Sequence, residues 1–492
     1  MKPPPGHKTH NKGEPKTMLD IALIRSRTDW VKAQIAKLGD EATLARIDRI
    51  VELDAERRQT RTECESAQAA RNKLNRAMGK LRGSKTMSPA EKAARANAAA
   101  SAIAKPDYEY ATVLLDGSKA AFEGAGDDEA DLQPAFQALI AALKRMGDTI
   151  DAGYARAKDI EAALQEEMLW LPNLPHETVP VFFSEDDNIP DVPVGEFREF
   201  DFEPKPHWEL GPALGIIDFE RGVKLSGSRY YVLSGWGARL QRALISFFLD
   251  CARANGYEEL YLPYIVHGQM LYGSAQFPKF QDTVYPVADG DKYLLPTSEV
   301  AIANLHRDEI LTEAQLPLRY VAHTPCFRSE KASAGRDVRG IKRVHQFEKV
   351  EMFQFTTPEA SYDALEAMTR GAESLCAALD IPYRRLEIVS GDLGFSASKK
   401  YDIEMWSPGC GEWLEVSSCS NTEAFQARRA GLRYYPRGSR KTRFLHTLNG
   451  SGLATPRTLI AILENNQQAD GNVLIPEALR PYLGGAEAIY PK

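Results

Sequence analysis

Arginines, lysines and carboxylates are concentrated in one short stretch of the chain, from Phe327 to Phe353. The stretch reads FRSEKASAGRDVRGIKRVHQFEKVEMF, within a chain of 492 residues whose net charge is −7. Guanidinium groups bind phosphates and carboxylates with paired, directed hydrogen bonds, whereas carboxylates accept hydrogen bonds from amino groups and hydroxyls. The stretch therefore favours a site in which the arginines bind phosphate and the acids bind an amino or hydroxyl group.

The flanks of this stretch predict the two strands of a hairpin. The first reads TPCFRSE (324–330) and the second reads RVHQFEKVEMFQF (343–355), with Gly335 and Gly340 as flexible points between them. Because alternate residues of a strand share one face, cations, an aromatic ring and an acid line up on the second strand. These residues are Arg343, His345, Phe347, Lys349 and Glu351. The alternative is a sheet face with exposed ion pairs, each contributing about 0–1 kcal/mol, and an ordinary sheet histidine at position 345.

Three further stretches place polar residues beside predicted secondary structure. YLLPTSEVAI (293–302) ends a strand in Thr297-Ser298-Glu299, and GEWLEVSSCSN (411–421) is a strand that carries Glu415 and Ser417-Ser418. LNGSGLATPRTLIAILEN (448–465) is predicted to be a glycine-rich turn that leads into a helix. In that helix we expect Thr455 as the N-cap, Pro456 at the first helical position and Arg457 in the first turn.

A long helical region precedes these motifs. Apolar residues recur at alternating steps of three and four from Phe136 to Leu171, which predicts a supercoiled helix. The segment from Leu44 to Leu81 is the expected partner in an antiparallel hairpin. From Ser66 to Lys85 the chain carries six basic residues and no acid. A solvated helix face is one interpretation of this run, and a polyanion partner is the other.

The remaining segments divide the chain into regions. We expect a disordered lead at 1–17, a helical arm at 18–174 with an insert at about 83–131, a proline-rich linker at 175–200, and a region of mixed strands and helices at 201–492. Ser88 and Pro89 are expected to begin a short helix in the insert. Strands and helices of the last region lack βαβ regularity, which favours an antiparallel sheet flanked by helices, an α+β fold.

The composition of the chain indicates which class of protein it belongs to. Hydrophobic residues make up 43% and charged residues 26% of the chain, as in ordinary globular proteins. No apolar run is long enough to span a membrane, and the N-terminus does not resemble a signal peptide. The six cysteines form no C-x-x-C pair, so we expect reduced thiols, no zinc site and a cytoplasmic location.

In this order, the motifs resemble the seryl-tRNA synthetases, a family of class II aminoacyl-tRNA synthetases. The resemblance rests on MLDIALIRS, HTPCFRSE, RVHQFEKVEMF, SSCSNTEAFQARR and TLNGSGLA, and it covers the chain from Met18 to about Gly485, apart from the insert. It implies a long antiparallel coiled-coil arm, a class II catalytic domain built on an antiparallel sheet, and a homodimer with its interface around Pro263. It also implies ATP-dependent attachment of L-serine to tRNA(Ser) through a seryl-adenylate, with tRNA(Sec) as a further candidate substrate.

The resemblance also implies a role for individual residues. Arg328 would bridge the serine carboxylate and the α-phosphate, with Arg343 and Arg457 as the other catalytic arginines. The serine contacts would be Thr297, Ser298, Glu299, Arg328, Glu351, Asn449 and Ser451. The ATP contacts would be Arg328, Ser329, Glu330, Val344, Phe347, Glu415, Val416, Ser417, Ser418 and Arg457. Glu415 and Ser418 would hold Mg²⁺ with ATP, and the tRNA contacts would be Arg71, Lys73, Arg76, Lys80 and Arg82.

Two other functions compete with this one. A related enzyme could make the adenylate and load a carrier protein instead of tRNA, but such relatives lack the long arm. A non-catalytic tRNA-binding or protein-binding relative would be expected to lose Arg328, Glu351, Glu415 or Arg457, and all four are present. For Glu351, an ion pair with Lys349 or Arg343 is the structural alternative to a role in serine binding.

Overall fold

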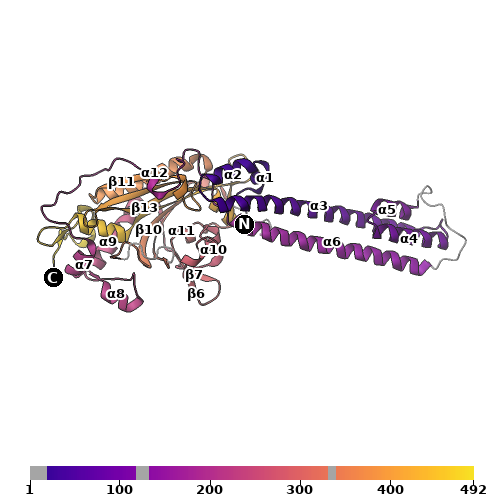
Figure 1. Cartoon of the computed structure of the whole chain (residues 1–492), viewed down its shortest axis with the longest axis horizontal. Coiled ribbons are helices and arrows are strands. Elements are labelled where there is room, and N and C mark those ends of the chain that lie inside the picture. The colour runs from indigo at the N-terminus through magenta and orange to yellow at the C-terminus, as the bar shows by residue number, and fades with distance from the viewer. Residues whose placement is uncertain (1–18, 118–131, 331–338, 492) are drawn as a thin grey trace, which may run out of the picture. The chain divides into compact units, whose positions relative to one another are not determined.

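The computed structural model describes residues 19–117, 132–330 and 339–491 (Figure 1). The described residues form two compact units, one of residues 46–167 and one of residues 19–45 together with 168–491. The predicted lead at 1–17 and the acidic end of the insert lie outside the described residues. Helices α1 (Ile21–Ser26) and α2 (Thr28–Ala36) belong to the larger unit, so the smaller unit begins at Arg46 and not at residue 18.

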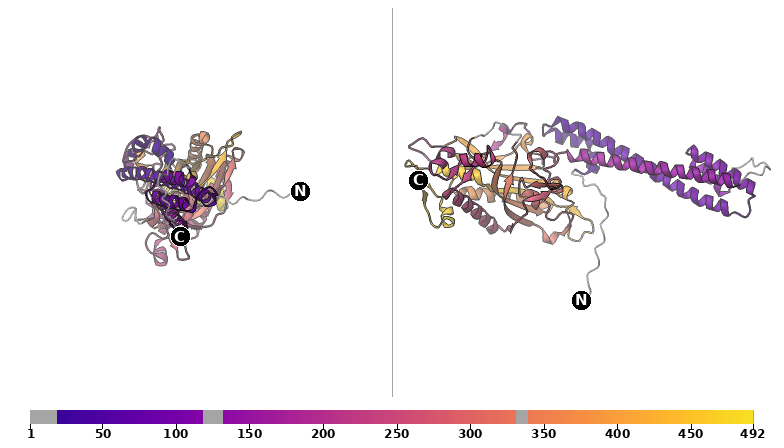
Figure 2. Two further views of the ribbon diagram at one scale, coloured as in Figure 1. Left: turned by 90° about the vertical axis from the view of Figure 1, so that its right-hand side faces the viewer. Right: turned by 90° about the horizontal axis from the view of Figure 1, so that it is seen from below.

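The smaller unit is built on two long helices that run side by side in opposite directions (Figures 1 and 2). They are α3 (Glu41–Gly83) and α6 (Leu132–Leu169). Arg57 Nη1 lies 2.7 Å from Glu161 Oε2, and Arg156 Nη2 lies 2.7 Å from Glu56 Oε1. The predicted seam is confirmed from Leu139 to Leu164, whose leucines, isoleucines and methionine are buried, whereas Leu171 lies beyond the end of α6.

The insert forms two short helices that pack on this hairpin. They are α4 (Pro89–Ala104) and α5 (Tyr108–Asp116). Ser88 Oγ accepts a hydrogen bond from the Glu91 amide at 3.1 Å, which confirms the predicted helix start. The buried face of α4 consists mainly of alanines, so its backbone approaches the long helices closely.

An eight-stranded sheet forms the centre of the larger unit and confirms the α+β prediction. Every neighbouring pair is antiparallel except β4 and β9, which are parallel. The order is β1 (Ile189–Pro190), β11 (Tyr383–Glu387), β12 (Lys399–Ser407), β13 (Glu412–Glu423), β16 (His446–Ala454), β10 (Gln346–Thr356), β9 (Leu318–Phe327) and β4 (Glu258–Leu260).

Smaller elements surround this sheet. The short strands are β2 (Ile217–Asp218), β3 (Val232–Leu233), β5 (Ile265–His267), β6 (Pro286–Val287), β7 (Lys292–Leu294), β8 (Ile310–Thr312), β14 (Arg433–Tyr435), β15 (Arg443–Phe444), β17 (Val473–Leu474) and β18 (Ala488–Ile489). The short helices are α7 (His207–Ala213), α8 (Phe219–Ser226), α10 (Gly268–Gly273), α11 (Glu299–Ile302) and α13 (Phe425–Ala430). Within the described ranges, no helix combines the length and the apolarity that crossing a membrane requires.

The sheet has one face in the main hydrophobic core and one face that carries polar side chains. Helices α9 (Trp236–Ala254), α12 (Ser361–Ala378) and α14 (Thr455–Asn465) share that core with Val350 and Met352 of β10. Because successive side chains of a strand point to opposite faces, Lys349 and Glu351 point away from the helices, whereas Phe347 lines the cavity and also packs against the edge of this core. The core thereby fixes the strand that presents the predicted site residues.

The predicted glycine-rich turn at Gly450-Ser451-Gly452 is wrong. These residues lie inside β16, which pairs with β10 on one side and β13 on the other. A Cβ on Gly450 would lie 2.6 Å from Met368 Sδ, so glycine is needed here for close packing and not for a turn. Thr455 is the first helical residue and not the N-cap, because its hydroxyl donates to the Glu348 carbonyl oxygen at 2.8 Å.

Candidate active site

A cavity of about 410 Å³ opens on the polar face of the sheet, between β10, β13, β16 and the start of α14. It brings together most of the predicted site residues. They are Thr297, Glu299, Arg328, Glu330, Arg343, Val344, Phe347, Glu351, Glu415, Val416, Ser418, Asn449, Ser451 and Arg457. Residues more than 150 positions apart in the chain therefore share one concave surface, as a single substrate site requires.

Three predicted serines do not line this cavity. The hydroxyl of Ser298 is buried beside Thr324 Oγ1 at 2.7 Å, and Ser329 Oγ donates to the Asp282 carbonyl oxygen at 2.9 Å. Ser417 Oγ donates to the Ser451 carbonyl oxygen at 2.6 Å, on the side of β13 opposite to Ser418. A register shift at Val416 interrupts the alternation, so Glu415 lines the cavity together with Ser418. The hydroxyls of these serines hold neighbouring backbone or side chains in place.

Three arginines reach the cavity from separate elements. Arg328, directly after β9, donates from Nε to the Pro296 carbonyl oxygen at 3.2 Å, and its guanidinium carbon lies 5.2 Å from the Phe347 ring centroid. Arg343 Nη1 lies 3.2 Å from Glu330 Oε2. Arg457, in the first turn of α14, donates from Nη1 to the Glu415 carbonyl oxygen at 2.6 Å. The cavity thus carries several fixed guanidinium groups, which suits a ligand with more than one anionic group.

Glu351 lies deep in the cavity with only 2% of its surface exposed. It forms an ion pair with Lys349, and its Oε2 accepts a hydrogen bond from Thr297 Oγ1 at 3.2 Å. The ion pair between Glu351 and Lys349, predicted as the alternative to serine binding, is confirmed. Glu351 nevertheless lines the cavity. Lys349 is a cavity residue that the prediction did not assign, although the strand alternation placed it on this face.

Glu299 is the second acid at this end of the cavity. Its Oε1 accepts hydrogen bonds from Gln426 Nε2 at 2.6 Å and from Asn449 Nδ2 at 3.2 Å. Burial raises the pKa of the Glu299 carboxyl to about 7, and the negative charge of Glu351 adds to this effect. The two acids together form a polar pocket that suits a small ligand with an ammonium group and a hydroxyl.

Glu415 differs from Glu299 because cations surround it. Burial raises the pKa of its carboxyl, but Arg457, Lys400 and Arg328 together bring that pKa below its ordinary value. Burial raises the pKa of the nearby Asp402 to about 7 despite Lys400, whose Nζ lies 3.4 Å from Asp402 Oδ2. Asp402 pairs with Ser418 across β12 and β13. The prediction missed it because a lone acid in a strand carries no motif.

Other cavity residues also escaped the prediction. Gln276, Ile341, Lys342, Ala454 and Pro456 complete the lining. Gln276 follows the short helix α10, far from the motifs in sequence, and no local pattern marks it. Lys342 was visible as part of the basic stretch, and its Nζ lies 2.7 Å from Glu412 Oε2.

The predicted tRNA contacts lie in the smaller unit, on the second half of α3. Lys73, Arg76, Lys80 and Arg82 are exposed, and Lys80 Nζ lies 3.7 Å from Asp116 Oδ1. Arg71 is half-buried, with its guanidinium against Gly147 of α6. At 100° per residue, Lys73, Arg76 and Lys80 lie within about 60° of one another around the helix axis, and Arg82 lies at least about 120° away.

Comparisons with known proteins match nearly the whole chain. The seryl-tRNA synthetase N-terminal domain matches residues 18–112, and the tRNA synthetase class II core domain (G, H, P, S and T) matches residues 285–466. A serine–tRNA ligase of Roseiflexus sp. is 50% identical over 472 residues, which cover 96% of this chain and 99% of the relative. A serine–tRNA ligase of Chloroflexus aurantiacus is 47% identical, with 96% and 100% covered.

Two solved structures that resemble this chain over nearly its whole length are also seryl-tRNA synthetases. The crystal structure of seryl-tRNA synthetase from Pyrococcus horikoshii complexed with ATP has a TM-score of 0.80 and 36% identity, and covers 96% of this chain and 100% of that chain. The cytoplasmic serine–tRNA ligase of Naegleria fowleri in complex with AMP has a TM-score of 0.81 and 29% identity, with 96% and 99% covered. The similarity thus extends over the arm and the sheet alike.

Proposed function

The chain belongs to the seryl-tRNA synthetase family, and from that premise we propose which of its residues activate serine and which bind tRNA. It is a class II synthetase that attaches serine to tRNA at the expense of ATP. The observation that supports the assignment of its site is the convergence of Arg328, Arg343 and Arg457 on one cavity with Glu299 and Glu351. The test is pyrophosphate exchange with each amino acid, which should depend on serine alone.

Activation brings two anions together, because the serine carboxylate attacks the α-phosphate of ATP. Arg328 can donate to both groups at once, while Arg343 and Arg457 bind the remaining phosphates. The substrate carboxylate is the nucleophile, so no side chain needs to supply one. The residues act by holding the reactants in line and by neutralising the charge that develops. Phe347 would stack on adenine, and Glu330 would accept from its amino group.

Mg²⁺ is the metal that this site fits. Glu415 is held in its ionised form by neighbouring cations, and Ser418 adds a hydroxyl oxygen on the same wall. Oxygen ligands from one or two side chains, completed by substrate phosphates, are typical of Mg²⁺ sites. When bound, the ion would neutralise phosphate charge, and Glu415 and Ser418 would hold it.

The serine pocket should reject alanine strongly. Glu351 and Thr297 can accept and donate hydrogen bonds to the serine hydroxyl, with Ser451 and Asn449 beside them. A site built to hydrogen-bond a substrate hydroxyl discriminates against an analogue without it by a factor on the order of 10⁴. We expect Glu351→Ala to lower kcat/KM for serine by at least about 10³-fold and to leave the KM for ATP nearly unchanged. An equal rise in both KM values would contradict a role in serine recognition.

Serine binding should also depend on pH through Glu299. The ionised carboxylate attracts the ammonium group of serine, and the pKa of this carboxyl is raised to about 7. The KM for serine should therefore fall about tenfold as the pH rises from roughly 6 to 8, when it is measured by exchange at saturating ATP. Glu299→Gln should bind serine weakly throughout that range. A KM of the parent protein that stays constant over the range would contradict this role.

The arm would bind tRNA(Ser), and tRNA(Sec) as a further candidate, through phosphate contacts on α3. We expect Lys73→Gln/Arg76→Gln/Lys80→Gln to weaken tRNA binding and to reduce the slope of log K against log salt by about 2–3. Arg82→Gln is the matched control on another face of the helix and should have a smaller effect. Equal effects of the triple variant and the control would exclude a single basic face.

The protein would work as a cytoplasmic homodimer. Around Pro263, Tyr261 has 88% and Ile265 has 48% of its surface exposed, which is unusual for large apolar side chains. This segment follows the edge strand β4, where a second copy of the chain could pack. Loading of a carrier protein is disfavoured, because α3 and α6 supply the long arm that such enzymes lack.

A further inference from the structure

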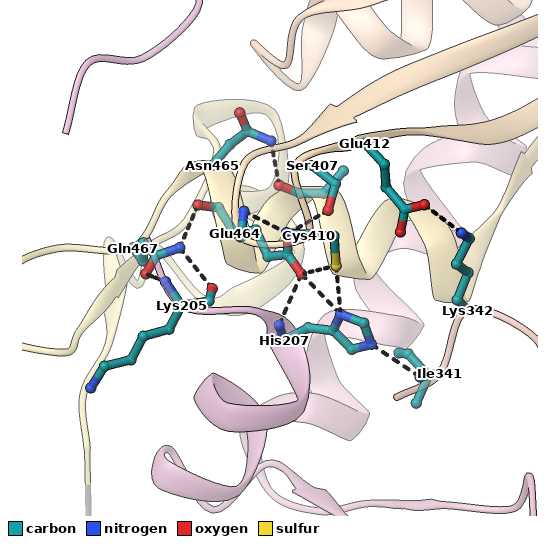
Figure 3. A network of polar contacts seen from close by, with 12 residues as sticks. Lys205, His207, Ile341, Lys342, Ser407, Cys410, Glu412, Glu464, Asn465 and Gln467 are labelled. Atoms are coloured by element: carbon teal, nitrogen blue, oxygen red, sulfur yellow. Dashed lines mark hydrogen bonds and ion pairs between the residues drawn. The ribbon is translucent and has the colours of Figure 1, made fainter. Parts of the chain in front are cut away.

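A buried hydrogen-bond network joins α7, α14 and the turn after β12, and it reaches the cavity lining at Ile341 (Figure 3). Glu464 of α14 is fully buried, and its carboxylate accepts from six donors. They are the His207 amide at 2.9 Å, His207 Nδ1 at 2.9 Å, Ser407 Oγ, the Gly409 amide at 3.0 Å, the Cys410 amide at 3.1 Å and Cys410 Sγ at 3.2 Å. Burial raises the pKa of Glu464, but hydrogen bonds from His207 and Ser407 bring it below its ordinary value.

His207 connects this anchor to the cavity wall. Its Nε2 accepts a hydrogen bond from the Ile341 amide at 3.1 Å (Figure 3). Because a backbone N–H can only donate, the ring proton must be on Nδ1, from which it is donated to Glu464. Gly340, just before Ile341, has a φ of +70°, and a Cβ there would lie 1.9 Å from His207 Nε2. Glycine is therefore required at this position for two independent reasons.

The anchored amide begins the segment 341–344, which lines the cavity and includes Arg343. Helix α14 contacts this segment directly as well, since Arg457 Nε donates to the Lys342 carbonyl oxygen at 3.4 Å. Arg457 and Glu464 are seven residues apart, which is about two helical turns, so they lie on one side of α14. Helix α14 thus holds the segment 341–344 in two ways. Arg457 near the N-terminus of α14 bonds the segment directly, and Glu464 near the C-terminus of α14 acts on it through His207.

A metal site is the other use for these side chains. Among the described residues, His207, Cys410 and Glu464 are the cluster whose ligand atoms lie close enough together, within 4.8 Å, to hold an ion. Both ring nitrogens of His207 and both oxygens of Glu464 already have hydrogen-bond partners. An ion would have to displace these hydrogen bonds and break the link to Ile341, so the network favours a hydrogen-bonded role.

We propose that Glu464 and His207 are positioning residues that fix the hinge at Gly340-Ile341 and thereby place Arg343 and Val344 against ATP. Neither residue lines the cavity, and the hydrogen bond from the Ile341 amide to His207 is their direct link to a segment that does. This inference rests on the proposed assignment of ATP to the cavity. It predicts a defect in ATP binding that is separate from serine binding and from tRNA binding.

The test combines the kinetics of pyrophosphate exchange with amide hydrogen exchange of the ligand-free protein. His207→Leu removes both side-chain hydrogen bonds, so the KM for ATP should rise roughly tenfold or more while the KM for serine changes less than about twofold. Amide exchange of peptides covering 339–347 should become faster in the same variant. His207→Gln, which keeps one donor and one acceptor, should restore much of both properties.

Two further variants separate positioning from a loss of folding. Gly340→Ala keeps every side chain of the network but forces the backbone at 340–341 and His207 Nε2 apart, so it should reproduce the rise in the KM for ATP. Gln467→Ala is the matched control, because the buried Gln467 bonds backbone atoms of the same region, those of Lys205 at 2.8 and 3.0 Å and the Glu464 carbonyl oxygen at 2.9 Å, but neither the Glu464 carboxylate nor the His207 ring. It should lower thermal stability without a change in the KM for ATP.

Three outcomes would overturn the proposal. The first is an unchanged KM for ATP in folded His207→Leu and Gly340→Ala. The second is an unchanged rate of amide hydrogen exchange at 339–347 in His207→Leu. The third is stoichiometric zinc in the purified parent protein by elemental analysis. The hydrogen-exchange result does not depend on what the cavity binds. Failure of the proposed function would appear separately, as serine-dependent pyrophosphate exchange that does not require Arg328.

Discussion

Replacing Arg328 by alanine should reduce serine-dependent pyrophosphate exchange by on the order of 10³-fold or more. Arg328 lines the cavity beside Phe347 and the end of β9, and in the proposed assignment it bridges the carboxylate of serine and the α-phosphate of ATP. Without its guanidinium the two anions repel each other, and the transition state loses donors that water cannot replace. The measurement is exchange at saturating serine and ATP, with single-turnover adenylate formation as a second readout.

The fold should tolerate this substitution. The Arg328 side chain donates a hydrogen bond to the Pro296 carbonyl oxygen, and its loss costs about 1 kcal/mol against a typical stability of 5–15 kcal/mol. Arg319→Ala is the matched control, because Arg319 lies on β9, the strand that Arg328 directly follows, but is exposed and outside the cavity. Arg328→Lys keeps the charge without the planar pair of donors and should be intermediate. Near-normal exchange by Arg328→Ala would refute the bridging role.

The sequence predicted elements whose patterns are local. The seam of α6 follows from apolar residues at heptad spacing, and the face shared by Phe347, Lys349 and Glu351 follows from strand alternation. The same alternation explains why Ser417 faces away from the cavity while Ser418 lines it. Such periodicities are set by backbone geometry, so they can be read without tertiary contacts.

The features that escaped prediction depend on distant parts of the chain. Gly450 and Gly452 suggested a turn, but β10 and β13 on either side hold them in a central strand. His207 and Glu464 are 257 positions apart, and although Glu464 lies near the end of the stretch 448–465, no local pattern links the two residues. Asp402 has a raised pKa only because the folded sheet buries it. In each case a tertiary contact sets the role of a residue that looks ordinary in sequence.

Removing the arm should separate the two half-reactions. Residues 46–167 form a compact unit by themselves, and Arg46 Nη1 lies 2.7 Å from Glu167 Oε2, so the two chain ends are adjacent. Helix axes in contact lie about 8–10 Å apart, so a linker of roughly four residues can replace the whole segment. Pyrophosphate exchange should stay within about threefold of the parent, because the cavity lies entirely in the other unit.

Transfer to tRNA should fall by on the order of 10³-fold in the same variant, since the phosphate contacts on α3 are lost together. The control keeps α3 and α6 and replaces only residues 84–131, so it retains Lys73, Arg76 and Lys80 in their helix. If the basic face of α3 binds tRNA, this control should charge tRNA far better than the armless variant. Equal loss of exchange and charging in the armless variant would instead show that the arm supports the catalytic unit and does not act in tRNA recognition.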